Sequence, residues 1–276
     1  KMEPTRVLLI QPPYTIYKKD YKRCMPPLGL ASIAALLERY NFEVKIIDAY
    51  VEGFEIEKDL GDFILVGLSD EEIYKAISDF NPDFVGISGM FSTQDQNVLR
   101  VCSFVKKFNP NIPIFVGGSH PTYSVKEVLN NQNIDFVVLG EGEITTLHLI
   151  QKLLSNEDIS NIDGLGYKKD GQIFVNSKEK YVENLDSLPD PARHLLNMEK
   201  YIKINLPQSP YTMKDRVTQV VTSRGCSARC TFCTTTNFWG NIYRVRSAKR
   251  VVDEIEMLIN KYGIEEIHFC DDNFSL

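Results

Sequence analysis

The chain has 276 residues, of which 43% are hydrophobic and 25% charged, the profile of a folded globular protein. Its net charge of −6 comes from 37 acidic and 31 basic residues without a long run of one sign, so no nucleic-acid partner is predicted. No apolar stretch approaches the roughly 20 residues that span a bilayer and the first residues lack a signal-peptide layout, so we expect a cytoplasmic protein with no membrane span.

Residues 1–154 alternate β-rich runs with amphipathic helical patterns. The predicted strands are 6–11, 42–48, 83–89, 112–118 and 135–141, and the predicted helices are 28–40, 70–80, 94–108, 124–130 and 143–154. Two helices open with S-x-x-E capping boxes, Ser69 to Glu72 and Ser124 to Glu127. This α/β alternation predicts a Rossmann-like, flavodoxin-like domain with a doubly wound parallel sheet.

The pattern changes at about residue 155. Residues 164–176 predict a hairpin that turns at Asp170 and Gly171, and a proline-punctuated stretch follows at 185–196. We therefore predict a hairpin and linker over 155–215.

A second β/α rhythm begins at residue 216. It consists of a strand at 216–223, a loop with cysteines, a helix that Ser247 caps and Gly263 ends, and a strand at 264–270. A closed β/α barrel needs about 200 residues or more. Residues 216–276 are therefore predicted to be the N-terminal part of such a barrel, apparently truncated.

Three of the six cysteines lie within eight positions, and the others are scattered. In chain order they are Cys24, Cys102, Cys226, Cys230, Cys233 and Cys270. In a reducing cytoplasm such a cluster indicates a metal site more than a disulfide framework. The C-x-x-x-C-x-x-C spacing would spread the sulfurs over about 10 Å of a regular helix, so we expect a curled loop at the carboxyl edge of a parallel sheet.

Three close thiolates suit a [4Fe–4S] cluster that leaves one iron open for an exogenous ligand, because such clusters usually take four thiolates. A structural zinc ion is the main alternative, and it requires four ligands. The nearest further candidates, His268 and Cys270, begin 35 residues beyond Cys233. A chance group of free thiols is the remaining alternative.

Small and polar residues follow the predicted strands of the first domain, where open parallel sheets bind ligands. The candidates are Ser92, Thr93, Gly117, Gly118, Ser119, His120, Gly140, Glu141 and Gly142. Their glycines allow a flat or bulky ligand to approach the backbone, although turns after strands favour Gly, Ser and Thr in any case. The first strand is followed by QPPY instead of G-x-G-x-x-G, which argues against a nicotinamide cofactor.

The segment TSRGCSARCTFC (222–233) resembles the signature of the radical S-adenosylmethionine superfamily. The resemblance implies that Cys226, Cys230 and Cys233 ligate three irons, that S-adenosylmethionine chelates the fourth, and that Phe232 packs near the adenine. FCDDNFSL (269–276) resembles the end of the second barrel strand in the cobalamin-associated branch, which implies contacts of Asp271 and Asp272 with S-adenosylmethionine. A solvated turn is the ordinary alternative for adjacent aspartates.

The order of PPLGL (26–30), GGSHPT (117–122) and GEGE (140–143) resembles the cobalamin-binding domain of the same branch, which contains methyltransferases and ring-forming cyclases. The resemblance implies that the candidates at the sheet edge bind cobalamin. The D-x-H-x-x-G element that offers a histidine to cobalt is missing, since Gly118 lies two positions before His120. We therefore expect His120 to be a hydrogen-bonding residue and not a cobalt ligand.

The resemblance implies an enzyme that methylates an unactivated carbon or phosphorus centre of a small molecule, or forms a ring, with a flavodoxin or ferredoxin-type reductant. One alternative is a cobalamin- or metal-binding module without catalysis. Another is a methylthiotransferase, which needs a second cluster on three cysteines before residue 216, where only Cys24 and Cys102 occur. Arg244 and Arg246 are expected to be surface residues, and Cys270 is expected to fill a strand interior.

Overall fold

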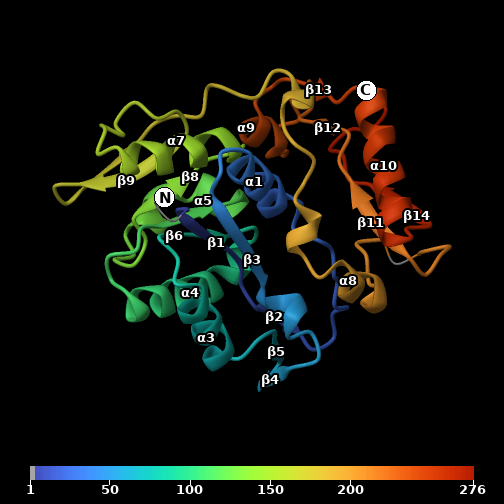
Figure 1. Cartoon of the computed structure of the whole chain (residues 1–276), viewed down its shortest axis with the longest axis horizontal. Helices are drawn as coiled ribbons and strands as arrows, with labels where there is room; N and C mark the ends of the chain where they lie inside the picture. The colour runs from blue at the N-terminus through green and yellow to red at the C-terminus, as the bar shows by residue number, and fades with distance from the viewer. Residues whose placement is uncertain (1–3, 210) are drawn as a thin grey trace.

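A seven-stranded sheet forms the centre of the computed structural model, which describes residues 4–209 and 211–276 (Figure 1). Its strand order is β10–β9–β8–β7–β6–β1–β3. The bounds are β1 Arg6–Gln11, β3 Glu43–Asp48, β6 Phe84–Ser88, β7 Ile114–Gly117, β8 Phe136–Val138, β9 Leu165–Lys169 and β10 Gln172–Val175. Strands β3, β1, β6, β7 and β8 are parallel, which confirms the predicted flavodoxin-like order and its topological switch between β1 and β6.

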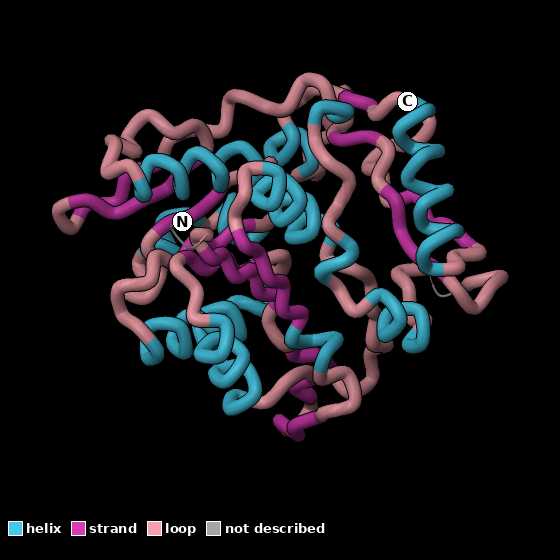
Figure 2. The backbone as a smooth tube through the Cα atoms, viewed as in Figure 1, coloured by secondary structure: helices cyan, strands magenta, loops and turns pink. Residues whose placement is uncertain are grey.

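Helices cover both faces of this sheet (Figure 2). Helices α1 (Leu28–Arg39) and α7 (Glu143–Leu154) pack on one face, and α3 (Asp70–Phe80), α4 (Asp95–Phe108) and α6 (Val125–Leu129) pack on the other. Along β1, Val7 and Leu9 belong to the first layer and Leu8 and Ile10 to the second, and all four are fully buried. The continuous apolar run of this strand follows from burial on both faces.

Two β elements differ from the predicted pattern. A separate antiparallel sheet has the order β2–β5–β4, with β2 Tyr14–Tyr17, β4 Glu57–Leu60 and β5 Phe63–Val66. The predicted hairpin is present, with positive φ at Asp170 and Gly171, but its strand β9 pairs antiparallel with β8 and so extends the main sheet.

The two predicted capping boxes have opposite outcomes. Ser69 caps α3 and exchanges both hydrogen bonds with Glu72, as predicted. The box at Ser124 is wrong, because the Ser124 side chain makes no capping hydrogen bond to α6. Ser124 also ends the short helix α5 (Ser119–Tyr123), where its N–H bonds to His120 O, so its backbone lacks the extended conformation of an N-cap.

The C-terminal unit begins the predicted β/α array. Strands β11 (Val217–Val220) and β14 (Glu266–Phe269) are parallel, and α10 (Ala248–Tyr262) lies beside them at one end of the molecule (Figure 1). Ser247 Oγ caps α10 at Arg250 N, and Gly263 ends it with φ 61°, as predicted. The cysteines lie between two short strands, β12 (Ser223–Arg224) and β13 (Arg244–Val245), where the chain also forms α9 (Thr235–Trp239).

The linker binds both units. Arg193 is buried in a 3-10 turn, and its Nη2 donates to Glu254 Oε1 at 2.7 Å and to Gln219 O at 2.8 Å in the C-terminal unit. On the other side, Ala192 N donates to Ala31 O of α1 at 2.9 Å. The linker is therefore attached on both sides and is not a free tether.

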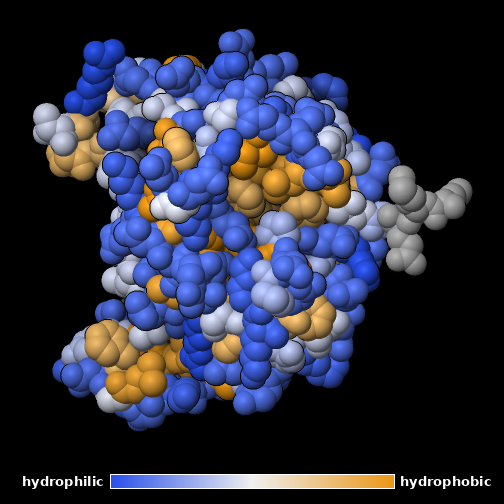
Figure 3. Space-filling view, turned by 90° about the vertical axis from the view of Figure 1, so that its left-hand side faces the viewer, coloured by the Kyte–Doolittle hydropathy of each residue, from blue (hydrophilic) through white to orange (hydrophobic). Residues whose placement is uncertain are grey.

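The outer surface carries scattered hydrophobic patches. Figure 3 looks onto one side of the molecule and shows such patches, one of them hollowed, within a mostly hydrophilic face. Among the helices of the part of the chain that the structure describes, none is long and apolar enough to cross a membrane.

A buried carboxyl group ties the helix α8 (Met198–Ile204) to the end of β3. Tyr201 Oη donates to Asp48 Oδ2 at 2.7 Å, and Val51 N donates to Asp48 Oδ1 at 3.0 Å. Burial raises the pKa of Asp48 to about 7, against the opposing effect of these two hydrogen bonds. Because the ordinary value is about 3.9, the folded protein holds this proton at pH values where the unfolded chain has lost it.

Because of Asp48, the free energy of unfolding should therefore fall as the pH rises from about 4 to 7. Relative to wild type, Asp48→Asn should gain stability over this window, on the order of a few kcal/mol, because the variant has no proton to lose. Urea denaturation at a series of pH values measures the difference. Tyr201→Phe keeps the carboxyl group, so its stability should still fall as the pH rises over this window, as in wild type. A difference between D48N and wild type that does not vary with pH would contradict the prediction.

Candidate functional site

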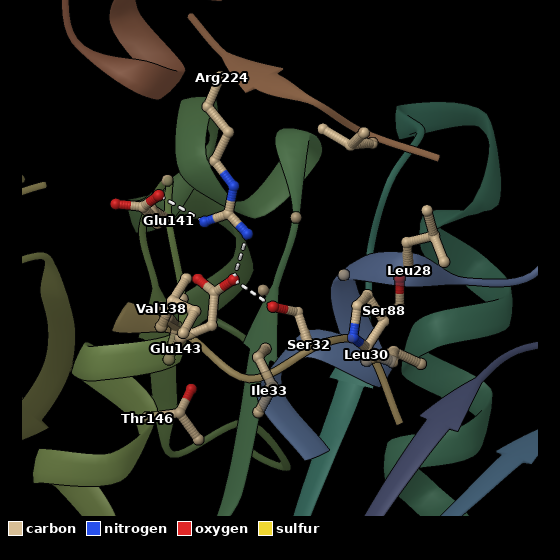
Figure 4. A pocket seen from close by; sticks show the side chains of 18 of the residues that line it. Leu28, Leu30, Ser32, Ile33, Ser88, Val138, Glu141, Glu143, Thr146 and Arg224 are labelled. Carbon is tan, nitrogen blue, oxygen red and sulfur yellow. Dashed lines mark hydrogen bonds and ion pairs between the residues drawn. The ribbon is translucent and has the colours of Figure 1, made fainter. Parts of the chain in front are cut away.

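A cavity of about 330 Å3 lies at the carboxyl edge of the main sheet (Figure 4). Its apolar floor includes Leu9, Phe115 and Val138 from the sheet, and Ile33 of α1 adds to it. The linker and the C-terminal unit complete the wall. Small-molecule sites occupy roughly 300–1,000 Å3, so a bulky ligand would extend beyond this volume.

The structure separates the predicted cobalamin residues into two groups. Five line the cavity, namely Gly117, Gly118, Gly140, Glu141 and Gly142. The remaining four, Ser92, Thr93, Ser119 and His120, lie outside the lining. His120 is buried, with Nδ1 3.1 Å from Ser92 Oγ and Nε2 3.3 Å from Asp95 Oδ1, as expected for a hydrogen-bonding residue.

Gly118 holds the backbone of two strand ends close together. Its φ is 114°, and a Cβ atom there would lie 2.8 Å from the carbonyl oxygen of Gly89. A larger residue would therefore be strained and would push the two strand ends apart. The Gly117–Gly118 pair shapes the cavity edge where the sequence predicted a close approach.

Two residues that line the cavity carry a buried hydroxyl group without a hydrogen-bond partner in the described structure. They are Thr146 Oγ1 on α7 and Ser223 Oγ on β12. An unsatisfied buried polar group costs about 1–3 kcal/mol. A small shift of either side chain would offer its hydroxyl to a ligand, and a molecule with an apolar body and a polar periphery fits this lining. No sequence signal distinguished either residue.

The three clustered cysteines share one loop. Cys230 is exposed, Cys226 and Cys233 are partly exposed, and all three are free thiols. Cys233 N donates to Cys230 O at 3.1 Å, which forms a turn, and hydrogen bonds from Thr235 lower the pKa of Cys233. Within residues 4–209 and 211–276, no three His, Cys, Asp or Glu side chains are arranged as a ready metal site.

The residues predicted to contact S-adenosylmethionine occupy different environments. Asp272 lines the cavity and accepts hydrogen bonds from Gly225 N and Thr235 Oγ1, both at 3.3 Å. Asp271 instead accepts three hydrogen bonds of 2.7 Å from the backbone and side chain of Thr222 and the backbone of Ser223. Phe232 is 89% exposed and lies outside the lining. Of the three, only Asp272 reaches the cavity.

An arginine next to the cysteine loop enters the cavity wall. Arg224 Nη2 donates to Glu143 Oε1 at 2.7 Å, and its Nη1 donates to Glu141 (Figure 4). Ser32 Oγ also donates to Glu143 Oε1 at 2.7 Å. Although burial raises the pKa of Glu143, the Arg224 guanidinium and the Ser32 hydrogen bond outweigh it and hold that pKa below its usual range.

Three expectations for individual residues are wrong. Arg244 is buried and donates to both carboxylate oxygens of Glu141 at 3.0 Å. Arg246 is partly buried, lines the cavity and binds Asp190 at 2.9 Å. Cys270 does not fill a strand interior, because it follows β14, is exposed and lines the cavity. The arginines were misjudged because Glu141 and Asp190, which they bind, lie 103 and 56 positions away in sequence.

Comparisons with known proteins agree with this architecture. Residues 14–150 match the B12 binding domain family. The chain is 41% identical to cytidylyl-2-hydroxyethylphosphonate methyltransferase of Streptomyces wedmorensis, over 98% of the chain and 55% of the relative. It is 30% identical to anaerobic magnesium-protoporphyrin IX monomethyl ester cyclase of Synechocystis, over 97% of the chain and 50% of the relative. The chain thus spans about half the length of the curated relatives it matches.

Solved structures show the same fold over nearly the whole chain. The cobalamin-dependent S-adenosylmethionine radical enzyme OxsB, with aqua-cobalamin and S-adenosylmethionine bound, superposes with a TM-score of 0.77 at 21% identity, over 99% of this chain and 34% of that one. The radical S-adenosylmethionine methyltransferase TsrM of Kitasatospora setae gives 0.70 at 18% identity, over 99% and 48%. Residues 14–150 thus belong to the B12 binding domain family, and over nearly its whole length the chain is similar to relatives named as a methyltransferase and a cyclase and has the fold of these cobalamin-dependent radical S-adenosylmethionine enzymes.

Proposed function

We propose that this chain carries the cofactor-binding part of an enzyme that methylates an unactivated carbon or phosphorus centre of a small molecule, using cobalamin, a [4Fe–4S] cluster and S-adenosylmethionine. One observation carries the proposal. The cavity at the edge of the cobalamin-binding sheet is also lined by Arg224 and Asp272, which flank and contact the cysteine loop. Two cofactors held on these two sides would meet at one cavity.

The cavity residues would hold cobalamin in different ways. Gly117, Gly118 and Gly142 leave space for a flat ring at the backbone, and the unpartnered hydroxyls of Thr146 and Ser223 lie next to the cavity, where a small shift would bring them to its polar edge. Since this volume is small, part of the cofactor would extend outside it. We expect no histidine on the cobalt, because both ring nitrogens of His120 already have partners.

The cysteine loop would hold the cluster through Cys226, Cys230 and Cys233. When bound, cobalamin supplies a carrier for the methyl group, and the cluster with S-adenosylmethionine supplies a carbon radical that removes hydrogen from the acceptor. The role of the protein is to orient these groups and to exclude water between them. We expect Asp272 to position S-adenosylmethionine, and its contact with the loop at Gly225 and its place in the cavity lining support this role. A flavodoxin or ferredoxin-type protein would supply the electron.

Ring formation is the second candidate, because relatives at 30% identity are named as cyclases. A methylthiotransferase is disfavoured because its second cluster needs three cysteines before residue 216, and this part of the sequence has only two. Both are buried, Cys24 in the layer on the α1 face of the sheet and Cys102 in the layer on the α4 face. These two thiols lie on opposite faces of the sheet and so lack the common loop that a cluster needs.

Anaerobic reconstitution of the full-length protein tests the cluster. We expect about four irons per chain, because three thiolates and S-adenosylmethionine complete one cubane. Cys226→Ala should lose most of this iron, whereas Cys270→Ala should retain it. Iron analysis and absorption spectra measure the outcome, and with S-adenosylmethionine, methylcobalamin and a reductant the wild type should release 5′-deoxyadenosine. A colourless protein that contains zinc would refute the cysteine assignment, and a cluster without any 5′-deoxyadenosine would favour the module without catalysis.

Cobalamin binding has its own test at Thr146. Thr146→Val keeps the shape of the side chain but removes the unpartnered hydroxyl beside the cavity, so the Kd for hydroxocobalamin should rise roughly 3- to 10-fold. Thr218→Val is the matched control, because Thr218 Oγ1 is also buried without a partner in the described structure but does not line the cavity. An absorbance titration measures both. Equal affinity of the two variants would exclude a role for the Thr146 hydroxyl in binding.

A further inference from the structure

The cysteine loop is closed at its base by two paired arginines. Strands β12 and β13 are antiparallel, with Ser223 opposite Val245 and Arg224 opposite Arg244. Residues 225–243 between them contain all three clustered cysteines. We call residues 222–246 the cysteine loop with its stem. Whatever holds the two arginines therefore sets the position of both ends of the loop.

Both arginines bind one carboxylate of the first domain. Arg244 Nη1 donates to Glu141 Oε1 and Oε2 at 3.0 Å, and Arg224 Nη1 donates to the same Oε1. Arg224 Nη2 donates to Glu143 at 2.7 Å. The exposed fractions of the side chains are 1% for Glu141, 5% for Glu143, 5% for Arg244 and 15% for Arg224. Two positive and two negative charges balance in this buried site, and removal of one would leave its partner uncompensated.

The backbone of the loop contacts the first domain at two further points. A Cβ atom on Gly140 would lie 2.7 Å from the Phe238 carbonyl oxygen, and Gly140 has a φ of 58°. Tyr123 Oη donates to Thr234 O, directly after Cys233, at 2.6 Å. The loop is thus held at its stem and along its second half by α5, which follows β7, and by the turn after β8 with the start of α7.

The same contacts form part of the cavity wall. Glu141, Glu143 and Arg224 line the cavity, and Ser32 on α1 joins Glu143 from the other side (Figure 4). A ligand that packs against this wall therefore touches the groups that hold the stem. A ligand that orders one part of such a network lowers the free-energy cost of ordering the rest.

We propose that Glu141 and Glu143 are positioning residues that fix the cysteine loop against the cavity, so that a ligand in the cavity and the loop order each other. The inference rests on the proposed function in one respect, because it takes the ligand to be cobalamin. Arg224 is suited to this role because the two arms of one guanidinium reach two different carboxylates. A lysine, with a single ammonium group, would hold them less well.

Hydrogen exchange of the full-length protein without its cofactors tests the contact itself. In Glu141→Gln and Arg224→Lys, amides of residues 222–246 should exchange at least about tenfold faster than in wild type, since a broken buried ion pair opens the stem. Tyr201→Phe is the control, because it removes a buried hydrogen bond between the first domain and α8 that does not line the cavity. It should leave this segment unchanged. If E141Q does not fold, R224K alone decides the result, and wild-type exchange in a folded R224K would overturn the proposal.

A second arm tests the mutual ordering with hydroxocobalamin at concentrations that saturate each protein. In wild type, cobalamin should slow exchange both at residues 114–120, on the cavity edge, and at residues 222–246. In R224K it should protect only 114–120, a loss of coupling that a general loss of stability would not produce. Protection of 222–246 in both proteins, or in neither while 114–120 is protected, would overturn the inference and leave cobalamin binding intact. Protection of neither segment in wild type would instead refute the proposed cobalamin site and the inference with it.

Discussion

The parallel arrangement of β3, β1, β6, β7 and β8 is the constraint on which the rest of the structure depends. Parallel strands end at one common edge, so the turns after β6, β7 and β8 meet there although they are spread along the sequence. Burial on both faces of the sheet holds β1 in place, because its side chains pack into the two core layers. This packing also fixes the edge at which the strand ends. The cavity and the attachment of the cysteine loop both form at that edge.

Charge balance explains why the two units stay together at this edge. Carboxylates as buried as Glu141 and Glu143 would be costly alone, and guanidinium groups as buried as Arg244 would be too. Each unit supplies one sign, so neither set of charges is compensated without the other. The linker adds a similar arrangement, in which Arg193 meets Glu254 and Arg246 meets Asp190 and Glu254. Such pairs specify how the units fit more than they stabilise the fold.

Much of the fold could be predicted because its signals are local. The alternation of apolar strands and amphipathic helices located the five parallel strands and the main helices, and the Asp170–Gly171 turn located the hairpin. The small sheet was missed because its strands are short, and β4 has four exposed residues without an apolar face. That β9 joins β8 could not be inferred either, because pairing between strands depends on contacts that no short pattern contains.

The site was predictable to the extent that it depends on turns and on one motif. The glycines after β7 and β8 and Asp272 do line the cavity, and the cysteines do share one loop. Thr146, Ser223 and Arg224 were missed because each looks ordinary in its own segment. The hydroxyls of Thr146 and Ser223 are notable because they have no hydrogen-bond partner in the described structure. Arg224 is notable because it binds Glu143 and Glu141, which lie 81 and 83 positions away in sequence. Only folding brings such residues to one place.

The attachment of the linker on both sides limits the movements by which a large ligand can enter the cavity. A hinge between the units would have to pull Arg193 away from Glu254 and Gln219, or Ala192 away from Ala31, and so strand a buried cation or an unsatisfied amide. Separation of the first domain from the C-terminal unit would therefore open the cavity only at a large free-energy cost. Segments that lie mostly in solvent, such as the stretch around Cys230, can shift at much lower cost. A bulky ligand should thus enter by displacement of such exposed segments, while the two units keep their relative positions.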